Sequence, residues 1–190
     1  NENKSNVYPQ AADFTFYGGL YRGVNLISVP KVHFDLDYYG GPGLQVTPRP
    51  CEDGGAAFEI MSWVTGGDEN YTVLYSVLDE EGREVAGAVI IYVPDVRKWD
   101  IDHPYLYAVR ALLQRRNEAW DEVTVRTGVR NFSCDPDRGF CINGTWTPLR
   151  GVSRHQDWLY KGNALTGEEH VQDARMIKEL GANTIRLAHY

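Results

Sequence analysis

The chain has 190 residues, 43% of them hydrophobic, and a formal net charge of −7 at pH 7. This is enough apolar material for a globular core, and the acidic balance argues against nucleic-acid binding, which needs a basic surface against the phosphates. No stretch approaches the roughly 18 apolar residues of a membrane-spanning helix, and the polar opening N-E-N-K-S-N is not a basic-then-apolar leader. We therefore expect a soluble protein without a membrane partner. The compartment stays open between cytoplasm and periplasm or secretion, and a removed or upstream leader is not excluded.

The N-terminal region contains one predicted strand. Residues 1–12 are polar and unpatterned, whereas residues 20–29 alternate apolar and polar side chains, as a strand with one buried face does. Gly18 and Gly19 permit a turn just before it. This strand is expected to belong to a preceding domain.

Short strands follow one another from residue 30 to about residue 130. Turn residues separate these runs, which is the pattern of an antiparallel β-sandwich of about a hundred residues. The region contains no acid/base pair and no metal-ligand cluster, so its expected role is structural. The predicted strands are residues 32–38, 57–64, 71–79, 84–93, 105–113 and 122–130.

Two of the three cysteines flank a predicted turn. Cys134 and Cys141 lie on either side of D-P-D-R-G-F, so they could face each other across a hairpin as a disulfide, or remain buried free thiols. Both alternatives stay open. Their spacing does not fit a zinc site, and no compact His/Cys cluster exists in the sequence.

The pattern changes after residue 135. An N-G turn at residues 143–144 precedes a predicted strand at residues 147–152. A helix is then expected from Thr166, because Glu169 three residues later completes a capping-box signature. The helix should end near Gly181, before a second strand at residues 182–187. Its predicted apolar face comprises Val171, Ala174, Ile177 and Leu180.

Strand, helix and strand over about forty residues predict a β-α-β unit with a parallel strand pair. Both strands of such a pair point the same way, so the residues that follow them meet at one edge. Arg154 and His155 follow the first strand, and Arg186 and His189 close the second. That edge holds the ligand in open α/β sheets and in β/α barrels. The four side chains suit hydrogen bonding to a hydroxyl-rich ligand or an anion. The alternative is that the arginines bridge strand ends and the histidines are structural.

Several segments in consistent order resemble glycoside hydrolase family 2, with β-galactosidases and β-glucuronidases as its most similar members. The resemblance implies the end of a jelly-roll sugar-binding domain (residues 1–29), an immunoglobulin-like β-sandwich (30–130) and the opening β-α-β unit of a (β/α)₈ barrel (131–190). The fold class is thus mainly β. The matching segments are F-Y-G-G-L-Y-R-G-V, H-P-Y-L-Y, I-N-G-T-W-T-P-L-R-G-V-S-R-H-Q-D and G-A-N-T-I-R-L-A-H-Y.

The resemblance also assigns residue roles. His155 and His189 match histidines that contact the glycone, and Arg186 matches an arginine that lines the barrel. Asp13 matches an aspartate that reaches from the jelly roll toward the sugar. In this chain Gln156-Asp157 follows the first histidine in place of His-Glu or Glu-His, which leaves the sugar uncertain. With Arg154, these residues form the expected substrate site.

The implied parent is a retaining β-glycosidase, most closely a β-galactosidase, that hydrolyses terminal non-reducing β-glycosides. Retention needs two carboxyl groups about 5 to 5.5 Å apart. The family places both glutamates beyond Tyr190, so no catalytic residue is expected within the chain, which should be inactive alone. Glu168 and Glu169 lie in the first helical turn, where capping and the helix dipole account for them, and Asp157 is a single carboxylate. The resemblance implies no certain cofactor and leaves Mg²⁺ or Na⁺ open for the parent.

Two other readings compete with a glycosidase. One is a carbohydrate-binding module of immunoglobulin type with an aromatic sugar platform, and the other is a structural linker domain. Neither explains the β-α-β unit with its terminal histidines. One helix and two strands cannot close a barrel, so the open edge is expected to pack on the sandwich or on another copy of the chain as a homo-oligomer.

Overall fold

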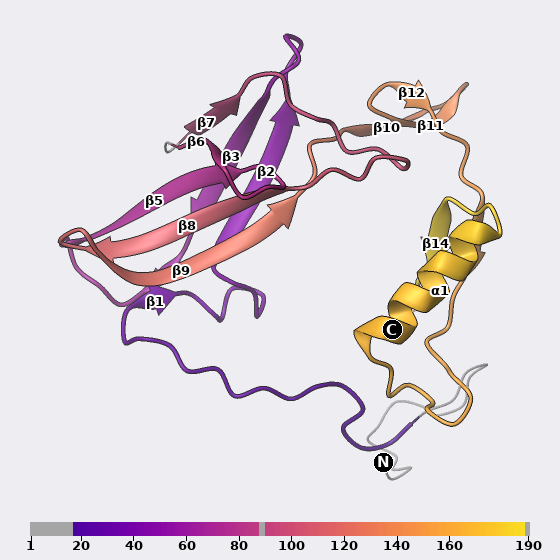
Figure 1. The fold of residues 1–190 in the computed structure, drawn as a ribbon, viewed down its shortest axis with the longest axis horizontal. Coiled ribbons are helices and arrows are strands. Elements are labelled where there is room, and N and C mark those ends of the chain that lie inside the picture. Colours follow the sequence, from indigo (N-terminus) through magenta and orange to yellow (C-terminus); the bar gives the residue numbers. More distant parts are fainter. Residues whose placement is uncertain (1–16, 88–89, 189–190) are drawn as a thin grey trace. The chain divides into compact units, whose positions relative to one another are not determined.

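The computed structural model describes residues 17–87 and 90–188 (Figure 1). It is mainly β, with antiparallel sheets, one parallel strand pair and one helix in this part of the chain. The chain divides into two compact units. One spans Ser28–Pro148, and the other combines the chain up to Ile27 with the chain from Leu149 onward. No helix of the described residues is long and apolar enough to cross a membrane.

The first unit contains two antiparallel sheets packed face to face. One has the order β2–β3–β7 and the other β6–β5–β8–β9. Their bounds are β2 Leu44–Pro50, β3 Ala56–Ser62, β5 Tyr71–Leu78, β6 Glu84–Ala86, β7 Ile90–Val93, β8 Tyr107–Arg115 and β9 Glu118–Thr127.

The core lies between these sheets. Alternate residues of β8, from Tyr107 to Leu113, are buried, as expected for a strand with one face inward. Phe58 and Ile91 from one sheet pack in the same buried cluster as Val77 and Val109 from the other. Contact between the sheets through these residues confirms the predicted immunoglobulin-like sandwich.

Two strands differ from the sequence expectation. β2 was not predicted; it contains Pro48 and Pro50, which it tolerates because it is an edge strand. The predicted strand 84–93 is two strands. β6 pairs with β5 whereas β7 pairs with β3, so the chain crosses from one sheet to the other between them.

The predicted strand at residues 32–38 is mostly a turn. Only β1 (His33–Phe34) is extended, and it pairs with β4 (Val64–Thr65). The carboxylate of Asp35 accepts the backbone N–H groups of Asp37 and Tyr38, and this turn ends the strand.

The predicted strand at residues 20–29 is wrong. These residues form no strand, and the Leu26 side chain is fully exposed. A strand needs a neighbour for its backbone N–H and C=O groups, and the described residues supply none to this segment. Asp13, the expected jelly-roll contact, lies outside the described residues.

A three-stranded meander follows the sandwich, with β10 Phe132–Asp135, β11 Gly139–Ile142 and β12 Thr145–Trp146. The predicted N-G turn joins β11 to β12, with both Asn143 and Gly144 at positive φ. Cys134 lies opposite Phe140, and Cys141 lies opposite Ser133. The cysteines are therefore one position out of register and on opposite faces. Both are free thiols, with Cys141 buried and Cys134 exposed.

The β-α-β unit has the predicted order and direction. β13 (Gly151–Ser153) and β14 (Thr184–Arg186) are parallel, and α1 (Gly167–Glu179) connects them. Thr166 and Glu169 form the predicted capping box, and Gly181 adopts positive φ after the helix.

The predicted apolar face of α1 is largely uncovered. Ile177 is half-buried, whereas Val171, Ala174 and Leu180 are exposed. Two strands of three residues each are too small to cover a helix of thirteen residues.

Candidate substrate-binding site

The chain leaving β13 has two distinct faces. From Gly151 to Trp158 the side chains alternate between exposed and half-buried, which is the period of an extended chain packed on one side. Val152, Arg154, Gln156 and Trp158 are the half-buried positions. We call the other side, represented by Ser153 and His155, the open face.

Arg186 lies on the open face. It is the register partner of Ser153 in the parallel pair, and its Nη1 donates to Ser153 Oγ at 3.4 Å. His155 is exposed two residues beyond Ser153, at the same end of the sheet. The parallel direction on which the predicted site depends is therefore confirmed. His189 lies outside the described residues.

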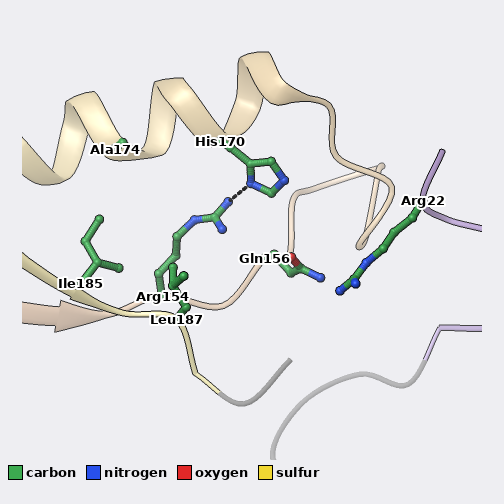
Figure 2. Close-up of a pocket in the computed structure, with 7 residues that line it drawn as sticks. All are labelled: Arg22, Arg154, Gln156, His170, Ala174, Ile185 and Leu187. Atoms are coloured by element: carbon green, nitrogen blue, oxygen red, sulfur yellow. Dashed lines mark hydrogen bonds between the residues drawn. The ribbon is translucent and has the colours of Figure 1, made fainter. Parts of the chain in front are cut away.

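Arg154 lies on the opposite face, toward α1. Its Nε donates to Asp173 Oδ2 at 2.6 Å, and its Nη2 lies 3.0 Å from His170 Nδ1 (Figure 2). A second contact between Arg154 and Asp173 completes an ion pair. The structure thus separates the two described arginines of the predicted site.

A cavity of about 370 Å³ lies on this helix side of the β-α-β unit. Arg22 from the N-terminal segment points toward Gln156 at its edge (Figure 2). Sequence reasoning missed Arg22 and His170 as lining groups, although Arg22 stands in the recognised Y-R-G-V stretch. The lining residues are Arg22, Arg154, Gln156, His170, Ala174, Ile185 and Leu187.

The loop between β13 and α1 is held by further polar contacts. Trp158 Nε1 donates to Asp173, with distances of 3.1 and 3.3 Å to its two oxygens. Tyr17 Oη donates to Asp157 Oδ1 at 2.8 Å. A Cβ on Gly162 would lie 2.6 Å from the Tyr17 ring, so the ring closely approaches the loop backbone. The segment at Tyr17 is thereby fixed against this loop.

Glu169 serves the helix terminus. Hydrogen bonds from Lys161 Nζ, then from the Thr166 hydroxyl and backbone N–H, lower the pKa of Glu169 to about 2. A carboxyl group with this pKa is ionised near neutral pH and is then unsuited to act as a proton donor. Asp157 and Asp173 are also engaged, with Tyr17 and with Arg154. Each of these three acids thus makes a contact within the loop or with the helix terminus, and no cluster of metal-ligating side chains occurs in residues 17–87 and 90–188.

An antiparallel sandwich followed by a parallel strand–helix–strand unit fits a multidomain protein in which the sandwich precedes an open α/β sheet or a β/α barrel. Two sequence models of a single family match these parts. "Glycosyl hydrolases family 2" matches residues 44–130, and "Glycosyl hydrolases family 2, TIM barrel domain" matches residues 136–190. The chain belongs to glycosyl hydrolase family 2, with its immunoglobulin-like domain followed by the start of the barrel domain.

Similar proteins carry two activity names. A beta-glucuronidase from Bacteroides fragilis is 32% identical over 100% of this chain and 30% of its own length. A beta-galactosidase from Thermoanaerobacter pseudethanolicus is 33% identical over 94% of this chain and 25% of its own. The solved structure of an FMN-binding beta-glucuronidase from Faecalibacterium prausnitzii L2-6 is 64% identical, with a TM-score of 0.94, covering 100% of this chain and 31% of that one. The chain therefore spans about a third or less of the length of these relatives.

Proposed function

We propose that the full-length protein is a retaining β-glycosidase that removes terminal non-reducing sugars from β-glycosides, with β-glucuronides as preferred substrates. The observation that carries this is the parallel β13–β14 pair, which directs His155 and Arg186 to the same end of one sheet. The family supplies the reaction class. The 64% identity to a beta-glucuronidase favours a glucuronide over the galactoside that the sequence analysis expected.

The open face has groups suited to a uronic acid. His155 and His189 would hydrogen-bond glycone hydroxyls, and Asp13 would approach the sugar from the N-terminal side. Arg186 adds a guanidinium that is exposed and contacts only the neutral hydroxyl of Ser153 among the hydrogen bonds of the described residues. A guanidinium forms charge-assisted hydrogen bonds with a carboxylate, which β-galactosides lack. Arg154 remains a predicted contact, although its ion pair with Asp173 favours a supporting role.

The catalytic carboxyls are proposed to lie after Tyr190. A retaining glycosidase needs a nucleophile and an acid/base about 5 to 5.5 Å apart, whereas Asp157, Glu169 and Asp173 of the β-α-β unit serve loop and helix contacts. The division into a jelly-roll end (1–29), a sandwich (30–130) and an opening barrel segment (131–190) is part of this proposal. The 190-residue chain alone is expected to hydrolyse no glycoside.

The direct test compares kcat/KM of the full-length protein on 4-nitrophenyl β-glucuronide and β-galactoside. We expect the glucuronide to be preferred and NMR to detect the β-anomer as first product. Equal or greater activity on the galactoside would overturn the substrate assignment, and an α-anomer would overturn retention. Turnover of either glycoside by the 190-residue chain alone would show that the carboxyl groups of this chain suffice for catalysis, and would overturn the proposal that the catalytic carboxyls lie after Tyr190.

Substitution of the open face tests the site itself. His155→Ala and Arg186→Gln should each lower kcat/KM for the glucuronide by about tenfold or more, since each removes a hydrogen bond to a buried polar ligand. His103→Ala is the control, because His103 is an exposed histidine of the sandwich unit. If all three variants keep wild-type kinetics, the open face does not bind the sugar.

We also propose that the full-length protein binds FMN, as the 64% identical relative is described as doing. An aromatic surface can stack on the flavin ring, and a cation can bind its phosphate. A groove of about 430 Å³ on the sandwich unit offers Tyr38, Tyr39 and the exposed guanidinium of Arg126. Tyr38 stacks on Trp63 with ring centroids 3.9 Å apart, and the Tyr39 side chain is largely exposed.

Flavin binding can be measured by quenching of FMN fluorescence on titration with the full-length protein. Tyr39→Ala and Arg126→Gln should weaken binding if the groove is the site, whereas Tyr92→Phe, elsewhere on the sandwich, should not. Unchanged affinity in both groove variants would place the site elsewhere. No quenching at all would reject FMN as a ligand.

A further inference from the structure

One carboxylate on α1 receives donors from two places in the loop that follows β13. Asp173 Oδ2 accepts Arg154 Nε at 2.6 Å, and the Arg154 Nη2 group forms an ion pair with the same oxygen. The indole Nε1 of Trp158, further along the same loop, also donates to Asp173. Arg154 and Trp158 are therefore fixed to one side chain of the helix. We call these three residues the Asp173 clamp.

The clamp is shielded from solvent. The side chains of Arg154 and Asp173 are 13% and 18% exposed, and His170 Nδ1 lies 3.0 Å from Arg154 Nη2. Ion pairs that are shielded in this way are screened less by water and salt than surface pairs. Removal of one partner leaves the other charge in a partly buried position without its counterion. The clamp therefore resists rearrangement of the loop.

The three residues between the anchors include His155, which belongs to the candidate site. His155, Gln156 and Asp157 lie between Arg154 and Trp158, and the alternation of burial directs His155 away from the helix. When both anchors of such a short segment are fixed, few backbone conformations remain for the residues between them. The position of the His155 imidazole on the open face thus depends on a carboxylate on the opposite face.

We propose that Asp173 is a positioning residue of the glycosidase: through Arg154 and Trp158 it holds His155 in the orientation that binds the glycone. This inference rests on the proposed function. It assigns Arg154 to the support of the site and gives α1 a part in substrate affinity. Asp173 itself contacts no sugar in this arrangement.

The decisive test is a double-mutant cycle in the full-length protein with 4-nitrophenyl β-glucuronide. Asp173→Asn should lower kcat/KM by about tenfold to a hundredfold, the range expected when a binding group is misplaced. His155→Ala should lower it also, and the double variant should be no worse than His155→Ala alone. Glu168→Gln, an exposed carboxylate of the same helix, is the matched control and should keep wild-type kinetics.

A merely structural role gives a different pattern. Asp173→Asn would then lower the amount of folded protein while KM stayed unchanged, and its effect would add to that of His155→Ala. Either result overturns the inference. If Asp173→Asn fails to fold, Trp158→Phe is the alternative variant, because it removes one neutral hydrogen-bond donor and leaves the ion pair between Arg154 and Asp173. It should raise KM for the glucuronide, as we also expect of Asp173→Asn. Unchanged KM in that variant also overturns the proposal.

A second measurement separates this inference from the proposed function. The imidazole NMR signals of His155, assigned by their loss in His155→Ala, should shift or broaden in Asp173→Asn and not in Glu168→Gln. Wild-type protein that hydrolyses no glycoside would reject the function, while the NMR comparison would still decide whether Asp173 orders His155. Unshifted His155 signals in Asp173→Asn would reject the clamp.

Discussion

Gly151 and Thr184 lie opposite each other in the parallel β13–β14 pair, and a Cβ at position 151 would lie 2.8 Å from the Thr184 backbone oxygen. Such a contact is too short for a real Cβ atom, so the strands would have to separate. These two residues therefore approach closely in the strand pair that precedes His155 and ends at Arg186.

Gly151→Ala should therefore weaken the β13–β14 pair. We expect a loss of about 1–3 kcal/mol, typical of overpacking where the backbone must move. Amide hydrogen exchange of β14 in the full-length protein measures this locally. Gly167→Ala is the control, because nothing lies within 4 Å of a Cβ there and alanine suits a helix start. Equal protection of β14 in both variants would contradict the close contact.

The carboxylate of Glu169 predicts an acid-sensitive helix start. Its pKa is about 2 in the folded chain, below the unfolded value of about 4.3, because Lys161 and Thr166 donate hydrogen bonds to the charged form. A carboxyl with a lowered folded pKa stabilises the fold above its unfolded pKa. That contribution is lost as the pH falls from about 4 toward about 2.

Glu169→Gln should accordingly destabilise α1 at pH 6, and its difference from wild type should shrink below about pH 3. Urea unfolding at both pH values, with exchange of the α1 amides as local readout, tests this. Glu168→Gln changes a neighbouring carboxylate that no described hydrogen bond uses, so it should show little pH-dependent difference. A Glu169→Gln deficit that stays constant from pH 6 to pH 3 would rule out the ionised form as the source.

Local signals in the sequence predicted the β-α-β unit well. The capping box at Thr166, the stop at Gly181 and the parallel direction all follow from short-range chemistry and from the connection rule for crossover helices. The roles of side chains on that unit were less predictable. Arg154 comes directly after β13 and Arg186 ends β14, but strand alternation combined with Asp173 on α1 places them on opposite faces.

The strand predictions were wrong where neighbouring strands, and not the local sequence, decide whether a strand forms. Apolar and polar side chains alternate in residues 20–29 as they do in a strand. This alternation gives the segment one apolar face, but it does not provide the neighbouring strand that the backbone hydrogen bonds of a strand require. Conversely, β2 contains two prolines and still forms, because an edge strand can leave backbone positions unpaired. The presence or absence of a neighbouring strand, rather than local propensity, explains why β2 forms a strand and residues 20–29 do not.

Asn143 combines a positive φ of 51° with two hydrogen bonds of its side chain. Nδ2 donates to the Trp99 backbone oxygen at 3.0 Å, and Oδ1 accepts the Asn131 backbone N–H at 3.1 Å. Asn143→Ala loses both bonds and adds backbone strain, so it should lower the free energy of unfolding by about 2–4 kcal/mol.

Asn143→Gly separates these two contributions, because glycine adopts positive φ freely but makes no side-chain hydrogen bond. It should be intermediate between wild type and Asn143→Ala in denaturant unfolding of the full-length protein. If alanine and glycine are equally destabilising, backbone strain contributes nothing and the hydrogen bonds account for the whole effect.

The register of β10 and β11 predicts that Cys134 and Cys141 differ in reactivity and do not pair. Cys134 is exposed, whereas Cys141 is 2% exposed and on the other face of the meander. A thiol-specific reagent should modify Cys134 rapidly in the native protein and reach Cys141 only on unfolding, since thiol reaction requires access. Cys134→Ser should remove the rapid phase assigned to this meander, and Cys141→Ser should leave it. Mild oxidation that links Cys134 to Cys141, detected by mass spectrometry after digestion, would show instead that β10 and β11 pair with a shift of one residue.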